Sequence, residues 1–237
     1  MKMAERITDI IYPRRCPVCD DAVTRPGLYI CDECADAFRP VRDPYCLKCG
    51  SPLRDDSADL CEDCKKENRK FTSGRAAFIY DDVLKESVYR YKYGNRAEYA
   101  DHFAESMADI LGSFIRSSGA RAFIPIPLHK SRLAKRGYNQ AALLADRLSE
   151  RFDIPVRNDI LIRSEKTRVQ KSLRASQRQN NLKKAFKIDS DVVKLKNIIL
   201  VDDIYTTGST IDAAAGCLKG AGVDNVNFVV LGIADIG

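Results

Sequence analysis

The chain has 237 residues, 45% of them hydrophobic and 30% charged, which suits one α/β domain with a smaller module beside it. It contains no stretch as long as a membrane span, and residues 1–16 lack the apolar core and cleavage site of a signal peptide, so we expect a cytoplasmic protein. The net charge is +6, but residues 121–187 hold 17 Lys and Arg against 5 Asp and Glu, which predicts an anionic ligand such as pyrophosphate, a sugar phosphate or a nucleic-acid backbone.

Eight of the nine cysteines form four Cys-x2-Cys pairs near the N-terminus, and the first members of successive pairs are 15 residues apart. The unit Cys-x2-Cys-x11-Cys-x2-Cys therefore occurs twice, with Cys16, Cys19, Cys31 and Cys34 in the first unit and Cys46, Cys49, Cys61 and Cys64 in the second. Two such pairs complete a closed four-thiolate shell, so we expect structural zinc, most simply one ion per unit. An interleaved arrangement, in which alternate pairs share an ion, fits the spacing equally. A redox role is disfavoured because thiol exchange does not require four regular pairs.

An α/β pattern follows the cysteine units. The polar residues 65–74 are interpreted as a linker, which divides the chain into a zinc-ribbon module (1–70) and a second domain (71–237). Strands are expected at residues 75–80, 122–127, 156–162, 198–201 and 226–233. Helices are expected at residues 83–93, 96–115, 139–152 and 209–219. This alternation predicts a doubly wound parallel sheet flanked by helices.

Residues 198–210 are the most informative segment. An apolar strand ends at Asp202 and Asp203, and a turn then leads into a helix. The turn offers hydroxyl and backbone donors from Thr206, Thr207, Gly208, Ser209 and Thr210. The first amides and the dipole of the helix favour a phosphate there, and the lack of a lysine distinguishes the segment from a Walker A loop. Adjacent carboxylates suit ribose hydroxyls and a magnesium shell, whereas the simpler alternative is an acidic strand end before a capped helix.

Two basic segments complete the predicted site. Residues 127–136 follow an expected strand and are interpreted as a loop that holds pyrophosphate through His129, Lys130, Arg132 and Arg136, with a solvated basic loop as the alternative. Residues 163–178 are polar and basic and are expected to form a mobile loop, which carries Arg168, Gln170, Arg174 and Arg178 and resembles the catalytic loop that closes over the ligand in phosphoribosyltransferases. This second loop could instead contact single-stranded DNA, although it contains no aromatic residue for base stacking.

Three single residues receive simpler interpretations. Cys217 is expected to be a small buried residue, and His102 a structural residue of its helix. Tyr205 either packs in the interior or stacks on the base of a ligand.

Residues 198–210 resemble, at all thirteen positions, the motif with which type I phosphoribosyltransferases bind phosphoribosyl pyrophosphate (PRPP). The resemblance implies that Asp202 and Asp203 contact the ribose hydroxyls and that residues 206–210 hold the 5-phosphate. Nearly the whole chain also resembles the ComF family of competence-associated proteins. That similarity rests on YPRRCPVC (12–19), KYGNR (92–96), IPIPLHKSRLAKRGYNQ (124–140) and the later Arg163, Thr167, Gln170, Leu173, Arg178, Asn181 and Phe186.

The ComF resemblance implies a role in natural transformation, in which single-stranded DNA enters the cytoplasm with the help of a helicase-like DNA translocase. We therefore expect a PRPP site, with Mg²⁺-dependent phosphoribosyl transfer to an acceptor that the sequence does not identify. A non-catalytic alternative is a scaffold that senses PRPP or a nucleotide, while its zinc module contacts the helicase-like partner and its basic face contacts DNA. A transcriptional regulator is disfavoured because no helix-turn-helix pattern stands out.

Overall fold

A parallel four-stranded sheet forms the centre of the computed structural model, which describes residues 13–25, 27–163, 185–189 and 195–235. From edge to edge the sheet contains β1 (Gly74–Ile79), β6 (Asn225–Ile233), β5 (Asn197–Tyr205) and β2 (Phe123–Pro125). The two central strands each contain a fully buried apolar run, residues 198–201 in β5 and residues 228–231 in β6, as expected for a sheet that is covered on both faces. The predicted fold class is thereby confirmed.

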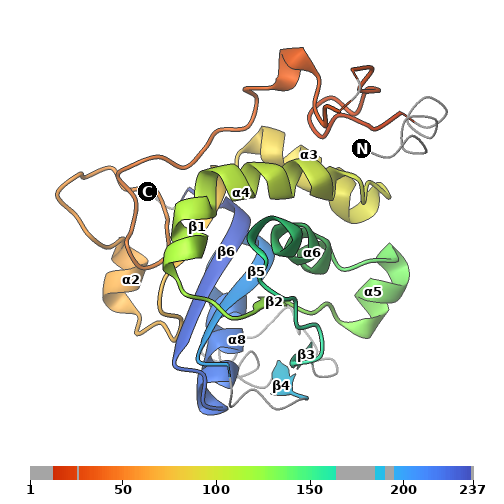
Figure 1. Cartoon of the computed structure of the whole chain (residues 1–237). Helices are drawn as coiled ribbons and strands as arrows, with labels where there is room; N and C mark the ends of the chain where they lie inside the picture. The colour runs from red at the N-terminus through yellow and green to blue at the C-terminus, as the bar shows by residue number, and fades with distance from the viewer. Residues whose placement is uncertain (1–12, 26, 164–184, 190–194, 236–237) are drawn as a thin grey trace, which may run out of the picture.

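Helices cover one face of the sheet and a mixed layer covers the other (Figure 1). The first layer comprises α3 (Asp82–Tyr93), α4 (Tyr99–Ser117) and α6 (Gln140–Phe152), and it packs on side chains such as Val229. The opposite layer comprises α8 (Ser209–Gly220) and the second group of cysteines, which pack on side chains such as Phe228. Neighbouring residues of β6 thus face opposite layers, as the pleat of a strand requires.

The cysteine-rich region is built around short turns with two small helices, η1 (Asp32–Cys34) and α2 (Glu62–Lys66). We call residues 16–34 unit 1 and residues 46–64 unit 2. The segment between the units lies antiparallel along β1, because Val41 donates to the carbonyl of Ala77 (2.9 Å) and Ile79 donates to that of Arg39 (2.8 Å). This segment covers an edge of the sheet that would otherwise be open to other chains.

The interpretation of residues 65–74 as a linker was wrong. Phe71 is fully buried and lies edge-to-face against Phe228, with ring centroids 4.9 Å apart. The backbone amide of Lys70 donates to the carboxylate of Asp212 in α8, and the amide of Gly74 donates to the carbonyl of Lys48 in unit 2 (2.9 Å). The segment was interpreted as a linker because it is polar, but its single aromatic residue, Phe71, packs in the same core as the cysteines of unit 2 and the sheet.

Two further element predictions need correction. Residues 127–136 contain the helix α5 (Lys130–Arg136), which begins at a cap formed by His129 and ends at Gly137 with φ +81°. The strand expected at 156–162 is displaced to β3 (Leu161–Arg163), which pairs antiparallel with β4 (Phe186–Ile188) as a separate ribbon. Both errors concern short elements, whose ends depend on caps and partner strands far along the chain. None of the helices in the described residues combines the length and apolar character needed to cross a membrane.

Candidate functional site

The segment with two carboxylates lies at the carboxyl end of β5, where ligands bind in open α/β sheets. β5 continues through Asp202 and Asp203 to Tyr205, so both acidic residues belong to the strand and do not follow it. Gly208 then begins α8 with φ +72°, and a Cβ at this position would overlap the side chain of Tyr205. Glycine is therefore required here by both conformation and space. No side-chain hydrogen bond caps α8 within the described chain, so its first amides are available to an anion.

A cleft of about 290 Å³ opens beside this turn. It brings together four residues of the predicted phosphate motif and two of the predicted pyrophosphate segment: Asp202, Asp203, Thr206, Thr210, Arg132 and Arg136. Thr207 and Ser209 lie next to the cleft, where their hydroxyl oxygens are 2.8 Å apart. His129 and Lys130 are not among the described residues that line it. The His129 ring accepts a hydrogen bond from the backbone amide of Ser131 (3.1 Å), which makes it a helix cap.

The predicted mobile-loop residues Arg168, Gln170, Arg174 and Arg178 lie outside the described residues. Tyr205 is buried below the turn of residues 206–208, and its ring stacks on that of Phe228 with the centroids 5.1 Å apart. Of the two interpretations of Tyr205, interior packing is therefore the correct one.

Lys92 is a residue of the cleft that the sequence reasoning did not select as a site. Its ammonium group lies 2.7 Å from the carboxylate of Asp203, and both side chains are largely buried. Burial at the base of the cleft and, next, the charge of Asp203 raise the pKa of Asp202 to about 7. One carboxylate is thus paired with a lysine, while the charge of its neighbour is disfavoured. The only earlier sign of Lys92 was its place in the KYGNR segment.

The cationic side of the cleft is arranged by a chain of polar contacts. Arg136 donates to the side-chain carbonyl of Gln140 (2.8 Å) and to the hydroxyl of Tyr93 (2.9 Å). The side-chain nitrogen of Gln140 (Nε2) is buried at the cleft and has no hydrogen-bond partner among the described residues. Burial and, next, the charge of Arg132 lower the pKa of Arg163 in the same cleft. An anion with oxygen acceptors would satisfy these donors and offset the repulsion between the two arginines.

The eight N-terminal cysteines form two separate clusters, one in each unit, and within a cluster the sulfur atoms lie within 4.8 Å of one another. Sulfur pairs such as Cys19 with Cys31 (3.7 Å) and Cys49 with Cys61 (3.6 Å) match the edge of a tetrahedron built from Zn–S bonds of about 2.3 Å. The donor chemistry and the geometry therefore fit two structural zinc ions. The clusters follow the simple assignment of one ion per unit and not the interleaved one.

The two units differ in how they join the rest of the protein. In unit 2, Cys46 and Cys49 are almost fully buried and belong to the core below the sheet. Unit 1 instead lies outside that core and attaches to α3 and α4 through polar contacts and through Val18 and Ile30, which pack against the helical layer, while Cys19 is exposed.

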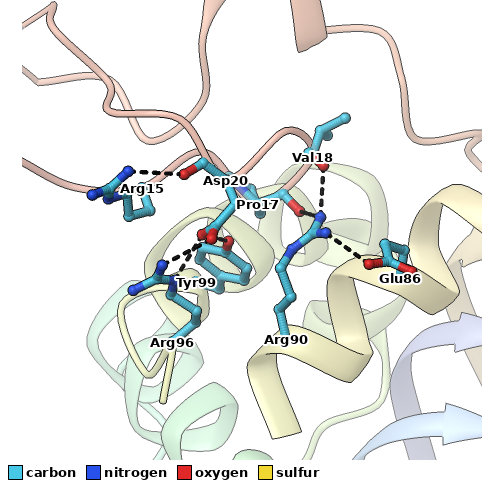
Figure 2. Close-up of polar contacts among 8 residues, drawn as sticks. All are labelled: Arg15, Pro17, Val18, Asp20, Glu86, Arg90, Arg96 and Tyr99. Carbon is cyan, nitrogen blue, oxygen red and sulfur yellow. Dashed lines mark hydrogen bonds and ion pairs between the residues drawn. The ribbon is translucent and has the colours of Figure 1, made fainter. Parts of the chain in front are cut away.

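Figure 2 shows the attachment of unit 1 in detail. The Asp20 carboxylate accepts two hydrogen bonds from Arg96 (2.7 and 2.8 Å) and one from the Tyr99 hydroxyl (2.6 Å). These contacts lower the pKa of Asp20, with the Arg96 hydrogen bonds as the main cause. Arg90 donates to the carbonyl of Val18 (2.6 Å) and pairs with Glu86. Helix α3 thus reaches unit 1 through Arg90 and the cleft through Lys92.

Comparisons with known proteins agree with this architecture. The double zinc ribbon domain family matches residues 7–65, and the phosphoribosyl transferase domain family matches residues 134–232. The chain is 32% identical to Competence protein F of Haemophilus influenzae, over 83% of this chain and 87% of that protein. It is 30% identical to Competence protein ComFC of Bacillus subtilis (87% and 85%) and 29% identical to DNA utilization protein YhgH of Salmonella typhimurium (90% and 94%). The chain therefore belongs to the ComF family of competence and DNA utilization proteins, in which a double zinc ribbon precedes a phosphoribosyltransferase domain.

Proposed function

We propose that the cleft binds PRPP together with Mg²⁺, and that the protein acts in the cytoplasm on single-stranded DNA taken up during natural transformation. The observation that carries the PRPP proposal is the meeting of two adjacent carboxylates, a hydroxyl-rich turn and two arginines around one cleft. The names of the relatives support the DNA part of the proposal. We also propose that residues 1–70 serve the zinc-dependent part of this role and residues 71–237 the PRPP-dependent part.

Each part of PRPP has a matching partner in the cleft. Asp202 and Asp203 accept hydrogen bonds from the two ribose hydroxyls, and such donors favour the ionised form of Asp202, whose pKa is raised by burial. The turn and the first amides of α8 hold the 5-phosphate, with Thr206 and Thr210 at the cleft wall. Arg132 and Arg136 face the pyrophosphate. Mg²⁺, when bound, neutralises part of the pyrophosphate charge and assists its departure.

Catalysis would consist of phosphoribosyl transfer. The bond from the ribose C1 to the pyrophosphate oxygen breaks, pyrophosphate leaves with the electron pair, and a nitrogen nucleophile forms the new bond to C1. The role of this chain is to position the ribose and to stabilise the leaving group. The described residues show no group placed to remove a proton from an acceptor, so turnover is tested separately from binding.

A second function, a non-catalytic scaffold for a helicase-like partner, is favoured by the attachment of unit 1. This unit contacts the domain through polar side chains and through Val18 and Ile30, and its exposed residues, such as Cys19, face outward. In this function the cleft would sense PRPP or a nucleotide without consuming it.

Calorimetric titration of PRPP with Mg²⁺ into the zinc-loaded protein tests the proposal. We expect binding by the native chain and at least about 100-fold weaker binding by Asp202→Ala/Asp203→Ala, since each carboxylate loses a charge-assisted hydrogen bond of about 1.5–3 kcal/mol. The matched control is Asp55→Ala/Asp56→Ala, another adjacent acidic pair, which lies on an exposed turn of unit 2. If the folded, zinc-loaded native chain does not bind PRPP, the PRPP proposal is refuted and the scaffold becomes the leading function.

A further inference from the structure

Two exposed tyrosines form a small aromatic surface on α3. Tyr89 and Tyr93 are one helical turn apart, with ring centroids 5.1 Å apart and planes tilted by 48°. Their relative exposures are 62% and 53%, and within the described chain only Leu47, also at 53%, matches Tyr93 among the exposed large hydrophobic residues. Single exposed apolar residues are common on proteins, but two adjacent exposed rings form a patch that a partner can cover. We call this pair the tyrosine ledge.

A cationic helix meets the ledge at Arg136. The guanidinium of Arg136 lies over the ring of Tyr93, 4.7 Å from its centroid, and also donates to its hydroxyl. Arg136 belongs to α5, a seven-residue helix with four cationic and no acidic residues. Within the described part of the chain none of these four cations forms a salt bridge, although most other charged helices of the protein contain ion pairs. Arg132 and Arg136 line the cleft, whereas Lys130 and Lys135 do not, so these two lysines are available to a different anion.

The combination identifies the chemistry of the partner. Flat exposed rings offer stacking faces, and the cations of α5, the helix that meets the ledge at Arg136, attract a chain of phosphates. Single-stranded DNA presents both an anionic backbone and unstacked bases, whereas the bases of a duplex are already stacked on one another. We propose that the tyrosine ledge and α5 together bind single-stranded DNA, with bases stacked on Tyr89 and Tyr93 and phosphates held by Lys130 and Lys135. This inference rests on the DNA-handling part of the proposed function and gives it a location.

The ledge is connected to the cleft. Arg136 holds Tyr93 with one amino group and Gln140 with another, and Gln140 lines the cleft. Single-stranded DNA bound on the ledge would therefore pass next to the proposed PRPP site. Residues 163–178, which are predicted to form a mobile loop, were the segment for which the sequence suggested DNA contact, and they contain no aromatic residue. The ledge supplies aromatic rings from α3, which the sequence analysis predicted only as a helix.

The test measures binding of the full-length, zinc-loaded protein to a fluorescent dT oligomer, to an abasic oligomer of equal length and to a duplex. We expect Tyr89→Ala/Tyr93→Ala to weaken dT binding at least about fivefold, because stacking contributes about 1–3 kcal/mol per base. Binding of the abasic strand should be unchanged, and Tyr89→Phe/Tyr93→Phe should retain dT binding because the rings remain. Tyr29→Ala is the matched control, since Tyr29 is another tyrosine packed under an arginine, Arg14 of unit 1.

The salt dependence separates the two parts of the surface. Lys130→Ala/Lys135→Ala should lower the slope of log K against log salt by about 1–2, whereas the tyrosine variants should leave the slope unchanged. The proposal is overturned if the native chain does not bind the dT oligomer, if the alanine variant binds it as tightly as the native chain, or if it loses abasic and dT binding equally. Equal binding of the duplex with the same dependence on tyrosine would also overturn it. PRPP titration of Tyr89→Ala, which lies outside the cleft, reports independently whether the PRPP proposal holds.

Discussion

The attachment of unit 1 allows a quantitative test of how the two parts of the protein are joined. Asp20 and Arg96 form a two-hydrogen-bond ion pair whose side chains are 30% and 28% exposed. Full burial would make the pair more costly to break, but here either partner can reach water when the other is removed, so solvent screening reduces its contribution. From about 1.5–3 kcal/mol for hydrogen bonds to charged groups, we expect a coupling free energy of about 1–2 kcal/mol.

A double-mutant cycle with Asp20→Ala and Arg96→Ala measures this coupling. The free energy of unfolding is obtained from urea titrations at one fixed concentration of free zinc, because zinc binding contributes to apparent stability. The control cycle uses Arg25 and Asp32, an ion pair within unit 1 that is 67% and 58% exposed, for which we expect less than about 0.5 kcal/mol. If the effects of Asp20→Ala and Arg96→Ala add within about 0.3 kcal/mol, the ion pair does not fasten unit 1 to the domain and the reasoning is refuted.

Three further predictions concern zinc, the phosphate turn and pH. Cys46→Ala should lower the bound zinc from two ions to one and destabilise the whole domain, because Cys46 is part of the core. Cys19→Ala should also lose one zinc ion, but with a smaller change in melting temperature. Metal analysis and melting curves check both variants, and equal destabilisation by the two would contradict the prediction. Gly208→Ala should lower the free energy of unfolding in urea by more than about 1–2 kcal/mol, because φ is +72° and the new methyl group overlaps Tyr205. An unchanged free energy of unfolding would show that the turn rearranges. Burial lowers the pKa of His102 to about 4 from an ordinary 6.5, so between these pH values the unfolded chain binds more protons than the folded chain. The free energy of unfolding should therefore fall as the pH is lowered through this range, by up to about 1.4 kcal/mol per pH unit. His102→Phe should flatten this part of a profile of urea midpoint against pH, and parallel profiles of the variant and the native chain would refute the lowered pKa of His102.

Several features of the protein were predictable from the sequence because their chemistry is local. The spacing of the cysteine pairs predicts closed four-thiolate sites without any knowledge of the fold. The alternation of apolar strands with helical segments predicts a parallel sheet. The segment 198–210 contains its strand, its carboxylates and its turn in one continuous stretch, so the motif could be identified before its surroundings were known.

The features that the sequence did not reveal depend on contacts between distant residues. The partnership of Lys92 with Asp203 spans more than a hundred residues and exists only because α3 packs beside the end of β5. Phe71 is one aromatic residue in a polar stretch, and its burial depends on unit 2 and the sheet meeting around it.

The boundary between the two modules shows the same division. Both cysteine units have the same local spacing, so the sequence by itself determined that the eight cysteines form four-thiolate sites, and the structure decided that each site lies within one unit. Only the tertiary structure decided that Cys46 and Cys49 of unit 2 are part of the hydrophobic core, while unit 1 packs on the helical layer through Val18 and Ile30 and pairs with it through Asp20 and Arg96. The physical reason is that a metal shell requires only a few residues of nearby chain, whereas burial and ion pairing depend on which surfaces the complete fold brings into contact.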